Sequence, residues 1–266
     1  MFMKIFKIIA ALSLFSAAAS FVNAAEIFGS YANGCIRGAQ ELRPADNFQI
    51  QVWGQGRNYG HPELISYINT LAKRVEHNKL PNLLVGDLSM RYGGPFGKSS
   101  SHGSHNTGLD VDISFDSSSP KKSSYELSHP KDVYLVDAKQ RPTKNFDINK
   151  VKLIYLAAID DRVERIFVAP GIKRGLCQSF KGKDRSWLSK IRPWFGHRAH
   201  MHVRLKCPKD SPNCIAQDPV PAGDGCGYEL ASWFEPPKPA AKSQKPKTVK
   251  KPKVLPAQCK AVLQGK

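Results

Sequence analysis

The chain has 266 residues, 41% of them hydrophobic, which is enough for a sizeable core in one large domain or two small ones. Lysine and arginine outnumber the acidic residues 40 to 22, and the resulting net charge of +18 favours an anionic partner. No recognisable DNA- or RNA-binding motif accompanies this charge, so the composition favours an acidic polymer and disfavours nucleic acid.

The first 24 residues have the pattern of a secretory signal peptide. Lys4 and Lys7 give a positive start, an apolar run follows over 8–21, and small residues at 22–24 suit a cleavage site. This run is shorter than the roughly 20 apolar residues of a membrane span, and no later stretch approaches that length. We expect an exported protein with no stable membrane span; an uncleaved N-terminal anchor is the less favoured alternative.

The hydrophobic pattern predicts two main helices and several strands. Apolar residues recur at helical spacing over 62–77, where Pro62 suits the first turn. A second helix is expected over about 149–160, with Asp147 as its N-cap. Short apolar or alternating runs predict strands at 83–88, 109–115, 132–136, 165–169 and 201–205. Because helices and strands do not alternate regularly, we expect an α+β fold with a mainly antiparallel central sheet and flanking helices and loops.

The end of the chain changes in composition. Residues 236–257 contain seven lysines, six prolines and no acidic residue, and such a segment cannot bury enough apolar surface to fold. We expect an extended linker here, between one domain over 25–235 and a tail over 258–266. The linker could hold the protein on an anionic polymer, or it could only deliver Cys259 to a distant partner.

Six cysteines lie beyond the signal segment, and an even number in an exported chain predicts disulfides. Six cysteines allow 15 pairings, so the number alone does not give the connectivity. No pair has the C-x-x-C spacing, which argues against a zinc ribbon or a thioredoxin-like redox centre.

Five of the eight histidines fall in two short clusters, over 101–115 and 194–205. In a strand at 109–115, Asp110 and Asp112 would lie on the face opposite the apolar residues. In a strand at 201–205, His200 and His202 would likewise share one face. The two strands would therefore present imidazole and carboxylate groups from their polar faces.

These groups suit a catalytic zinc site, which takes three nitrogen or oxygen ligands from the protein and leaves a position for water. His105, Asp112 and His202 would supply such a set, although the pattern alone does not say which of Asp110 and Asp112 binds the metal and which supports it. Gly108 would allow a tight turn before the strand. Ordinary surface or core histidines are the alternative, and two converging clusters make it less favoured.

The strings SHGSHNTGLDVDI and PWFGHRAHMHVRLKCP resemble the penicillin-insensitive murein endopeptidases, members of the metallopeptidase group named for lysostaphin, D-Ala-D-Ala peptidases and sonic hedgehog. The likeness covers nearly the whole mature chain. It implies the disulfide-stapled α+β fold of that group over 25–235, Zn²⁺ as cofactor and peptidoglycan in the periplasm as partner. The activity it implies is hydrolysis of D-alanyl to meso-diaminopimelyl cross-links by metal-activated water, and of related L,D-linked bridges.

The resemblance also assigns roles to individual residues. His105 and Asp112 match the first two zinc ligands of the family, and His202 matches the third. His200 matches the histidine beside the metal, which is expected to act as general base or to stabilise the tetrahedral intermediate. His197 matches a further active-site histidine.

Accessory positions and disulfides follow from the same resemblance. His102 and Asp137 match an accessory metal site, but Gln140 stands where relatives can carry a histidine, which weakens the case for a second metal. Apart from the resemblance, Arg91, Arg198 and Arg204 are candidate holders of substrate carboxylates because a guanidinium pairs bidentately with such groups, and solvation at the surface is the favoured alternative for any one of them. The disulfide pairs implied are Cys35–Cys259, Cys177–Cys226 and Cys207–Cys214.

Three other functions compete with this one. The residues at 118–121 formally match the S-x-x-K motif of serine enzymes, but the S-D-N and K-T-G motifs that should accompany it are absent. A non-catalytic peptidoglycan-binding zinc protein would need a closed, four-ligand site. A metallopeptidase of the D,D-carboxypeptidase type would share the metal ligands and differ in substrate.

Overall fold

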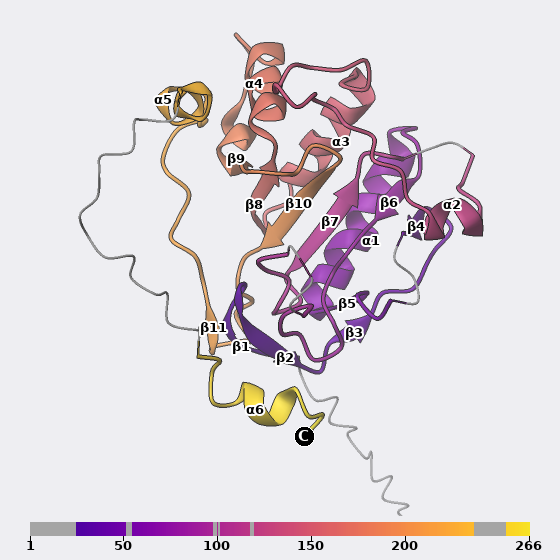
Figure 1. Ribbon diagram of the computed structural model, residues 1–266, viewed down its shortest axis with the longest axis vertical. Helices are drawn as coiled ribbons and strands as arrows, with labels where there is room; N and C mark the ends of the chain where they lie inside the picture. The colour runs from indigo at the N-terminus through magenta and orange to yellow at the C-terminus, as the bar shows by residue number, and fades with distance from the viewer. Residues whose placement is uncertain (1–24, 52–54, 98–99, 101, 118–119, 237–253) are drawn as a thin grey trace, which may run out of the picture.

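The computed structural model describes residues 25–51, 55–97, 100, 102–117, 120–236 and 254–266 (Figure 1). The predicted signal segment 1–24 and most of the predicted linker lie outside these residues, as does part of the S-x-x-K match. Within the described ranges, no helix is both long and apolar enough to cross a membrane.

A six-stranded sheet carries most of the described fold. The three inner pairs of neighbouring strands are antiparallel and the two outer pairs are parallel, so the expectation of an α+β fold with a mainly antiparallel sheet is confirmed. In spatial order, the strands are β4 (Phe48–Ile50), β6 (Leu83–Val85), β7 (Asp110–Ser114), β10 (His200–Leu205), β8 (Val163–Val168) and β9 (Ile191–Pro193).

Two smaller sheets and several short helices complete the described structure (Figure 1). One of the smaller sheets consists of β11 (Cys214–Ile215), β1 (Glu26–Ser30) and β2 (Asn33–Arg37). The other pairs β3 (Gln40–Glu41) with β5 (Tyr59–Gly60). The helices are α1 (Pro62–His77), α2 (Ser124–Ser128), α3 (Ile148–Ala158), α4 (Pro170–Ser179), α5 (Tyr228–Ala231) and α6 (Cys259–Val262), with 3-10 turns η1 (Ser186–Lys190) and η2 (Ser232–Phe234).

The two main helices form as the sequence predicts. The first helix, α1, has the predicted bounds, and the His61 side chain caps it by accepting a hydrogen bond from the backbone N–H of Glu63. The N-cap of α3 is Asp147, whose carboxylate accepts from the N–H of Lys150 at 3.0 Å. The inward residues of both helices share one buried cluster with Met201 and Val203 of β10, so this side of the central strands is core.

The predicted strand at 132–136 is wrong. Within it, only Val136 forms an isolated bridge, to Pro142. Leu135 and Val136 are buried, but a tight turn follows at once, because the Asp137 side chain binds the backbone N–H of Arg141. Leu135 and Val136 therefore pack into the core from a loop and do not form a strand.

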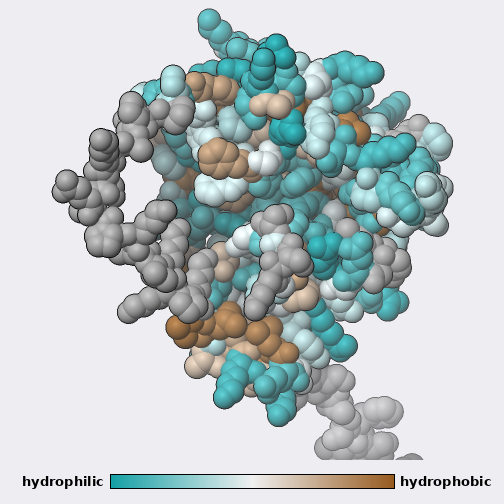
Figure 2. Space-filling model, viewed as in Figure 1, coloured by the Kyte–Doolittle hydropathy of each residue, from teal (hydrophilic) through white to brown (hydrophobic). Residues whose placement is uncertain are grey.

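All six cysteines are paired, in the three disulfides that the resemblance implied. Cys35–Cys259 fastens α6 to β2 in a small buried cluster with Phe28 and Val262. Figure 2 shows an apolar patch in the region of this tail. Val254, which precedes the tail in the sequence, is 86% exposed.

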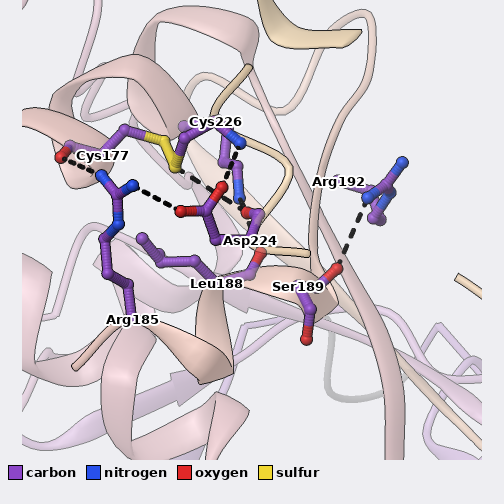
Figure 3. The surroundings of a disulfide bond; sticks show 8 residues. Cys177, Arg185, Leu188, Ser189, Arg192, Asp224 and Cys226 are labelled. Atoms are coloured by element: carbon purple, nitrogen blue, oxygen red, sulfur yellow. Dashed lines mark hydrogen bonds and ion pairs between the residues drawn. A yellow bond between two sulfur atoms is a disulfide. The ribbon is translucent and has the colours of Figure 1, made fainter. Parts of the chain in front are cut away.

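The second disulfide, Cys177–Cys226, ties α4 to the segment that precedes α5 (Figure 3). Beside it, the guanidinium of Arg185 pairs with the Asp224 carboxylate at 2.6 Å and also donates to the carbonyl of Cys177. The third, Cys207–Cys214, closes the loop between β10 and β11.

Candidate metal centre

The register of two neighbouring strands brings the two histidine clusters together. On β7 and β10, His202 lies opposite Asp112, and Arg204 lies opposite Asp110. Directly opposed residues of an antiparallel pair project to the same face. The alternation that the sequence predicts therefore places carboxylates and imidazoles on one face, while Met201 and Val203 fill the core on the other.

His105 reaches this face from the turn before β7. Its φ is +72°, which is uncommon for a residue other than glycine, and its backbone N–H donates to Asp110 Oδ2 at 3.2 Å. Its ring Nδ1 lies 2.6 Å from the Leu88 carbonyl, which can only accept, so Nδ1 carries the proton. The other ring nitrogen, Nε2, is left free and lies 3.5 Å from Asp112 Oδ2.

Gly108 permits the turn that follows His105. Its φ is +69°, and a Cβ at this position would lie 2.9 Å from the backbone nitrogen of His61. Both the backbone conformation and the close approach require glycine, as the sequence predicts.

Asp112 is the carboxylate on which the histidines converge. Its Oδ1 lies 3.2 Å from Nδ1 of His202, and its Oδ2 faces Nε2 of His105. Burial opposes ionisation of this carboxyl, but the nearby His105 and His200 hold its pKa well below the usual range.

Asp110 lies behind His202. Its Oδ1 is 2.7 Å from Nε2 of His202 and accepts a hydrogen bond from Nε of Arg204, also at 2.7 Å. Burial acts against a charged His202, yet the charge and hydrogen bond of Asp110 raise the pKa of His202 to about 9. Of the two aspartates, Asp112 thus faces the cluster and Asp110 orients one imidazole from its far side.

The other predicted histidines surround this group. His102 Nδ1 lies 3.8 Å from Asp112 Oδ2, and His200 Nε2 lies 3.8 Å from Asp112 Oδ1. The His197 ring is 5.0 Å from that of His200. Burial, and then the charges of His200 and His202, lower the pKa of His197 to about 4, so its imidazole is neutral near pH 7.

A cleft of about 610 Å³ opens over these histidines. Among the residues that line it are His102, His197, His200 and His202, together with the aromatic side chains Phe167, Trp194 and Phe195. The cluster therefore faces a space that a peptide can enter.

The side chains present fit a cation. Nε2 of His105 and Oδ1 of Asp112 are buried and make no hydrogen bond, although such atoms are normally satisfied. Ligand atoms of His102, His105 and Asp112 all lie within 4.8 Å of one another, the one group of this kind within the described ranges. Imidazole nitrogen and carboxylate oxygen are the donors that zinc accepts.

The side chains at the predicted accessory site, Asp137 and Gln140, have other partners. The Asp137 carboxylate binds the side chain and the backbone N–H of Arg141, and the Gln140 side chain accepts from the backbone N–H of Gly171. Arg204 is largely buried, binds Asp110 and Gln217, and is among the residues that line the cleft, so it helps to position the cluster.

The two other predicted arginines lie against aromatic rings. Arg91 lies over Tyr92 and Arg198 over Tyr134. The residues that line the cleft include neither arginine.

Asp87 and Arg57 are parts of the site that the sequence does not single out. Asp87 Oδ2 lies 3.4 Å from Nε2 of His102, and its Oδ1 lies 3.1 Å from Nε of Arg57. Burial raises the pKa of Asp87 to about 6, against the opposing charge of Arg57. The only sequence signal for Asp87 is that an aspartate follows the apolar strand β6. Arg57 comes from a distant loop, and no sequence pattern marks it.

The fold and the site together define an enzyme cleft built around a candidate cation site. The family model for penicillin-insensitive murein endopeptidases matches residues 27–264. Penicillin-insensitive murein endopeptidases of Salmonella paratyphi C (strain RKS4594) and Salmonella newport (strain SL254) are each 46% identical over 243 residues, which cover 90% of this chain and 86% of the relative. The chain belongs to the penicillin-insensitive murein endopeptidase family, and it is a peptidase of peptidoglycan.

Proposed function

We propose that the chain is a zinc-dependent endopeptidase that hydrolyses D-alanyl to meso-diaminopimelyl cross-links of peptidoglycan in the periplasm. The observation that carries the metal assignment is that Nε2 of His105 and Nδ1 of His202 face the two oxygens of the Asp112 carboxylate, at 3.5 and 3.2 Å, beside a cleft that His202 lines. The chain has 40 basic and 22 acidic residues, and its positive net charge suits a polymer whose stem peptides carry free carboxylates.

Three side chains would hold the zinc ion in this proposal: His105, Asp112 and His202. Bound zinc supplies Lewis acidity for the scissile carbonyl and lowers the pKa of a water molecule. Asp110 keeps the Nε2 side of His202 occupied, so Nδ1 stays turned to the cluster. His102 and Asp137 remain proposed accessory ligands, and the contacts of Asp137 with Arg141 favour His102 of the two.

In this proposal, His200 moves the proton of the reaction. Its side chain is 34% exposed in the cleft, and its Nε2 lies 3.8 Å from Asp112. Neutral His197 lies next to it and adds no positive charge near pH 7. We assign His200 as general base, with His197 as a second imidazole beside the reacting atoms.

Cleavage of defined muropeptide dimers tests the reaction. We expect the protein to split D,D-linked dimers, to lose this activity when zinc is removed by a chelator, and to regain it when zinc is restored. Activity that persists without metal would contradict the metal assignment. Release of terminal D-alanine from uncross-linked stems, with intact dimers, would instead indicate a D,D-carboxypeptidase.

Substitution of His200 separates catalysis from metal binding. His200→Ala should keep one zinc per chain and the wild-type fold, but lose at least about 100-fold in kcat, because a positioned general base contributes on this order. The matched control is His129→Ala, which removes an exposed histidine of a different region that stacks on Tyr125. Full activity of His200→Ala on purified peptidoglycan would refute its role as general base.

A further inference from the structure

Three aromatic side chains form one exposed surface beside the histidines of the cleft, which we call the aromatic shelf: Trp194, Phe195 and Trp233. The ring centroids of Phe195 and Trp233 are 4.9 Å apart, and those of Trp194 and Trp233 are 6.3 Å apart. Phe195 is 75% exposed and Trp194 is 52% exposed. None of these rings has a part in the proposed chemistry.

The backbone holds the shelf at both ends of a short turn. The N–H of Trp194 donates to the carbonyl of Val168 at 2.8 Å, and the N–H of Ala169 donates to the carbonyl of His197 at 3.0 Å. Both anchors lie at the end of β8, a strand of the central sheet. The rings of Trp194 and Phe195 are therefore presented by a turn fixed to the sheet, so little ordering of these two would be needed on binding, while Trp233 comes from η2.

The shelf is continuous with the candidate metal centre through one ring. Phe167 of β8 meets Trp194 edge-on at 5.8 Å on one side and His202 at 5.4 Å on the other. Trp194, Phe195, Phe167 and His202 all line the same cleft. A polymer whose cross-link reaches the histidines would thus extend over the shelf.

Exposed aromatic rings in contact with one another mark an interaction surface, because water contact with so much apolar area is unfavourable. The shelf rings carry no charge, whereas stem peptides are recognised mainly through carboxylates and amines. The glycan strand of peptidoglycan, in contrast, presents flat pyranose faces lined by C–H groups. Such faces match flat aromatic rings in shape and polarity.

We propose that the aromatic shelf binds the glycan strand of peptidoglycan by stacking of its sugar rings, beside the peptide that is cut. This inference rests on the proposed function for the choice of peptidoglycan as the polymer. It adds a subsite that distinguishes cross-links attached to glycan from free cross-linked peptides.

Binding of peptide-free glycan strands, prepared by amidase digestion of peptidoglycan, tests the shelf without any cleavage. We expect the wild-type protein to bind them, and Phe195→Ala and Trp233→Ala each to weaken binding about tenfold, the change that corresponds to one stacking contact of about 1.4 kcal/mol. Phe195 is the better first choice, since its large exposure makes a folding defect least expected. Wild-type protein that does not bind these strands would overturn the proposal.

A second measurement compares KM for dimers that carry disaccharides with KM for the same dimers without sugars. In Phe195→Ala, KM for the sugar-bearing dimers should rise about tenfold, while KM for the sugar-free dimers stays unchanged. In Tyr125→Ala, both KM values should stay at their wild-type values. Tyr125 is 71% exposed on α2 and does not line the cleft, so it controls for loss of an exposed ring. Equal losses on both dimers would show a peptide-binding or structural role and overturn the proposal.

These outcomes are separate from those of the metal test. Glycan binding needs no zinc and no turnover, so failure of the chelator experiment would leave the binding result standing. Conversely, a shelf that does not bind glycan would leave zinc-dependent cleavage of dimers untouched.

Discussion

At the scale of single residues, the site depends on which nitrogen of each imidazole is already engaged. The Leu88 carbonyl forms a hydrogen bond with Nδ1 of His105, and the Asp110 carboxylate forms one with Nε2 of His202. The remaining nitrogens, Nε2 of one ring and Nδ1 of the other, both face Asp112. The unusual φ of His105 is held by its hydrogen bond to Asp110, so one carboxylate orients two of the proposed ligands.

Asp110→Asn should therefore weaken zinc binding without removing a ligand. We expect a loss of about 10- to 100-fold in zinc affinity, the usual effect of removing a partner of a metal-bound histidine. Competition with a chromophoric chelator measures it. Asp132→Asn, an exposed aspartate that binds Tyr134, is the control, and zinc affinity equal to wild type in Asp110→Asn would contradict the positioning role.

The sequence predicted the ligand types but not their arrangement. The alternation over 109–115 placed both aspartates on the polar face, and this is how they lie. Which of them faces the cluster depends on the register of β7 against β10 and on the tautomer of His202, neither of which has a local pattern. Asp87 and Arg57 join only through the tertiary fold, which is why they were missed.

At the scale of elements, the long periodic helices and four of the five expected strands were predictable, whereas two-residue strands and a glycine-containing helix were not. The 16-residue α1 has six buried residues at helical spacing. By contrast, β11 has two residues and pairs with β1, whose partner residues lie 185 positions earlier (Gly29 opposite Cys214). The helix α4 was missed because Gly171 and Gly175 lower helix propensity. Gly175 is needed there, since a Cβ would come within 2.6 Å of the Phe146 ring.

Lys173 ties α4 to its neighbours and should make stability depend on pH. Its buried ammonium donates to the carbonyls of Leu188 and Asp224. Burial, and then the charge of Arg192, lower the pKa of Lys173 to about 7 from 10.5. Between these two pH values the unfolded chain binds the extra proton, so the free energy of unfolding rises with pH across this window.

Lys173→Met removes this titration. Relative to the variant, the wild type should gain stability from pH 7 towards pH 9, by an amount on the order of 1 kcal/mol or more. Urea unfolding at several pH values measures the difference. Parallel curves for the two proteins over this range would show that Lys173 does not titrate as described.

At the scale of the whole molecule, disulfides close loops of very different length. Cys35–Cys259 spans 224 positions and returns the C-terminal tail to β2, whereas Cys207–Cys214 spans seven. The tail also lies beside the loop that leads to the histidines. A Cβ added at Gly94 would lie 2.9 Å from the Leu263 side chain, and the N–H of Gly94 donates a hydrogen bond to the carbonyl of Asn106.

Removal of the long-range disulfide should cost more stability than removal of the short one. From loop-closure entropy we expect a loss of about 5 kcal/mol for Cys35→Ala with Cys259→Ala, against about 2 kcal/mol for Cys207→Ala with Cys214→Ala. Denaturant unfolding of the oxidised proteins gives both values. A larger loss for the short loop would argue that the tail adds little to the fold.

The most direct test of the proposed centre is anomalous diffraction at the zinc absorption edge from crystals of the zinc-loaded protein. We predict one strong peak bound by Nε2 of His105, the carboxylate of Asp112 and Nδ1 of His202, with Asp110 still bound to Nε2 of His202. A zinc peak away from these three side chains, or zinc held through Nε2 of His202 with Asp110 displaced, would contradict the account.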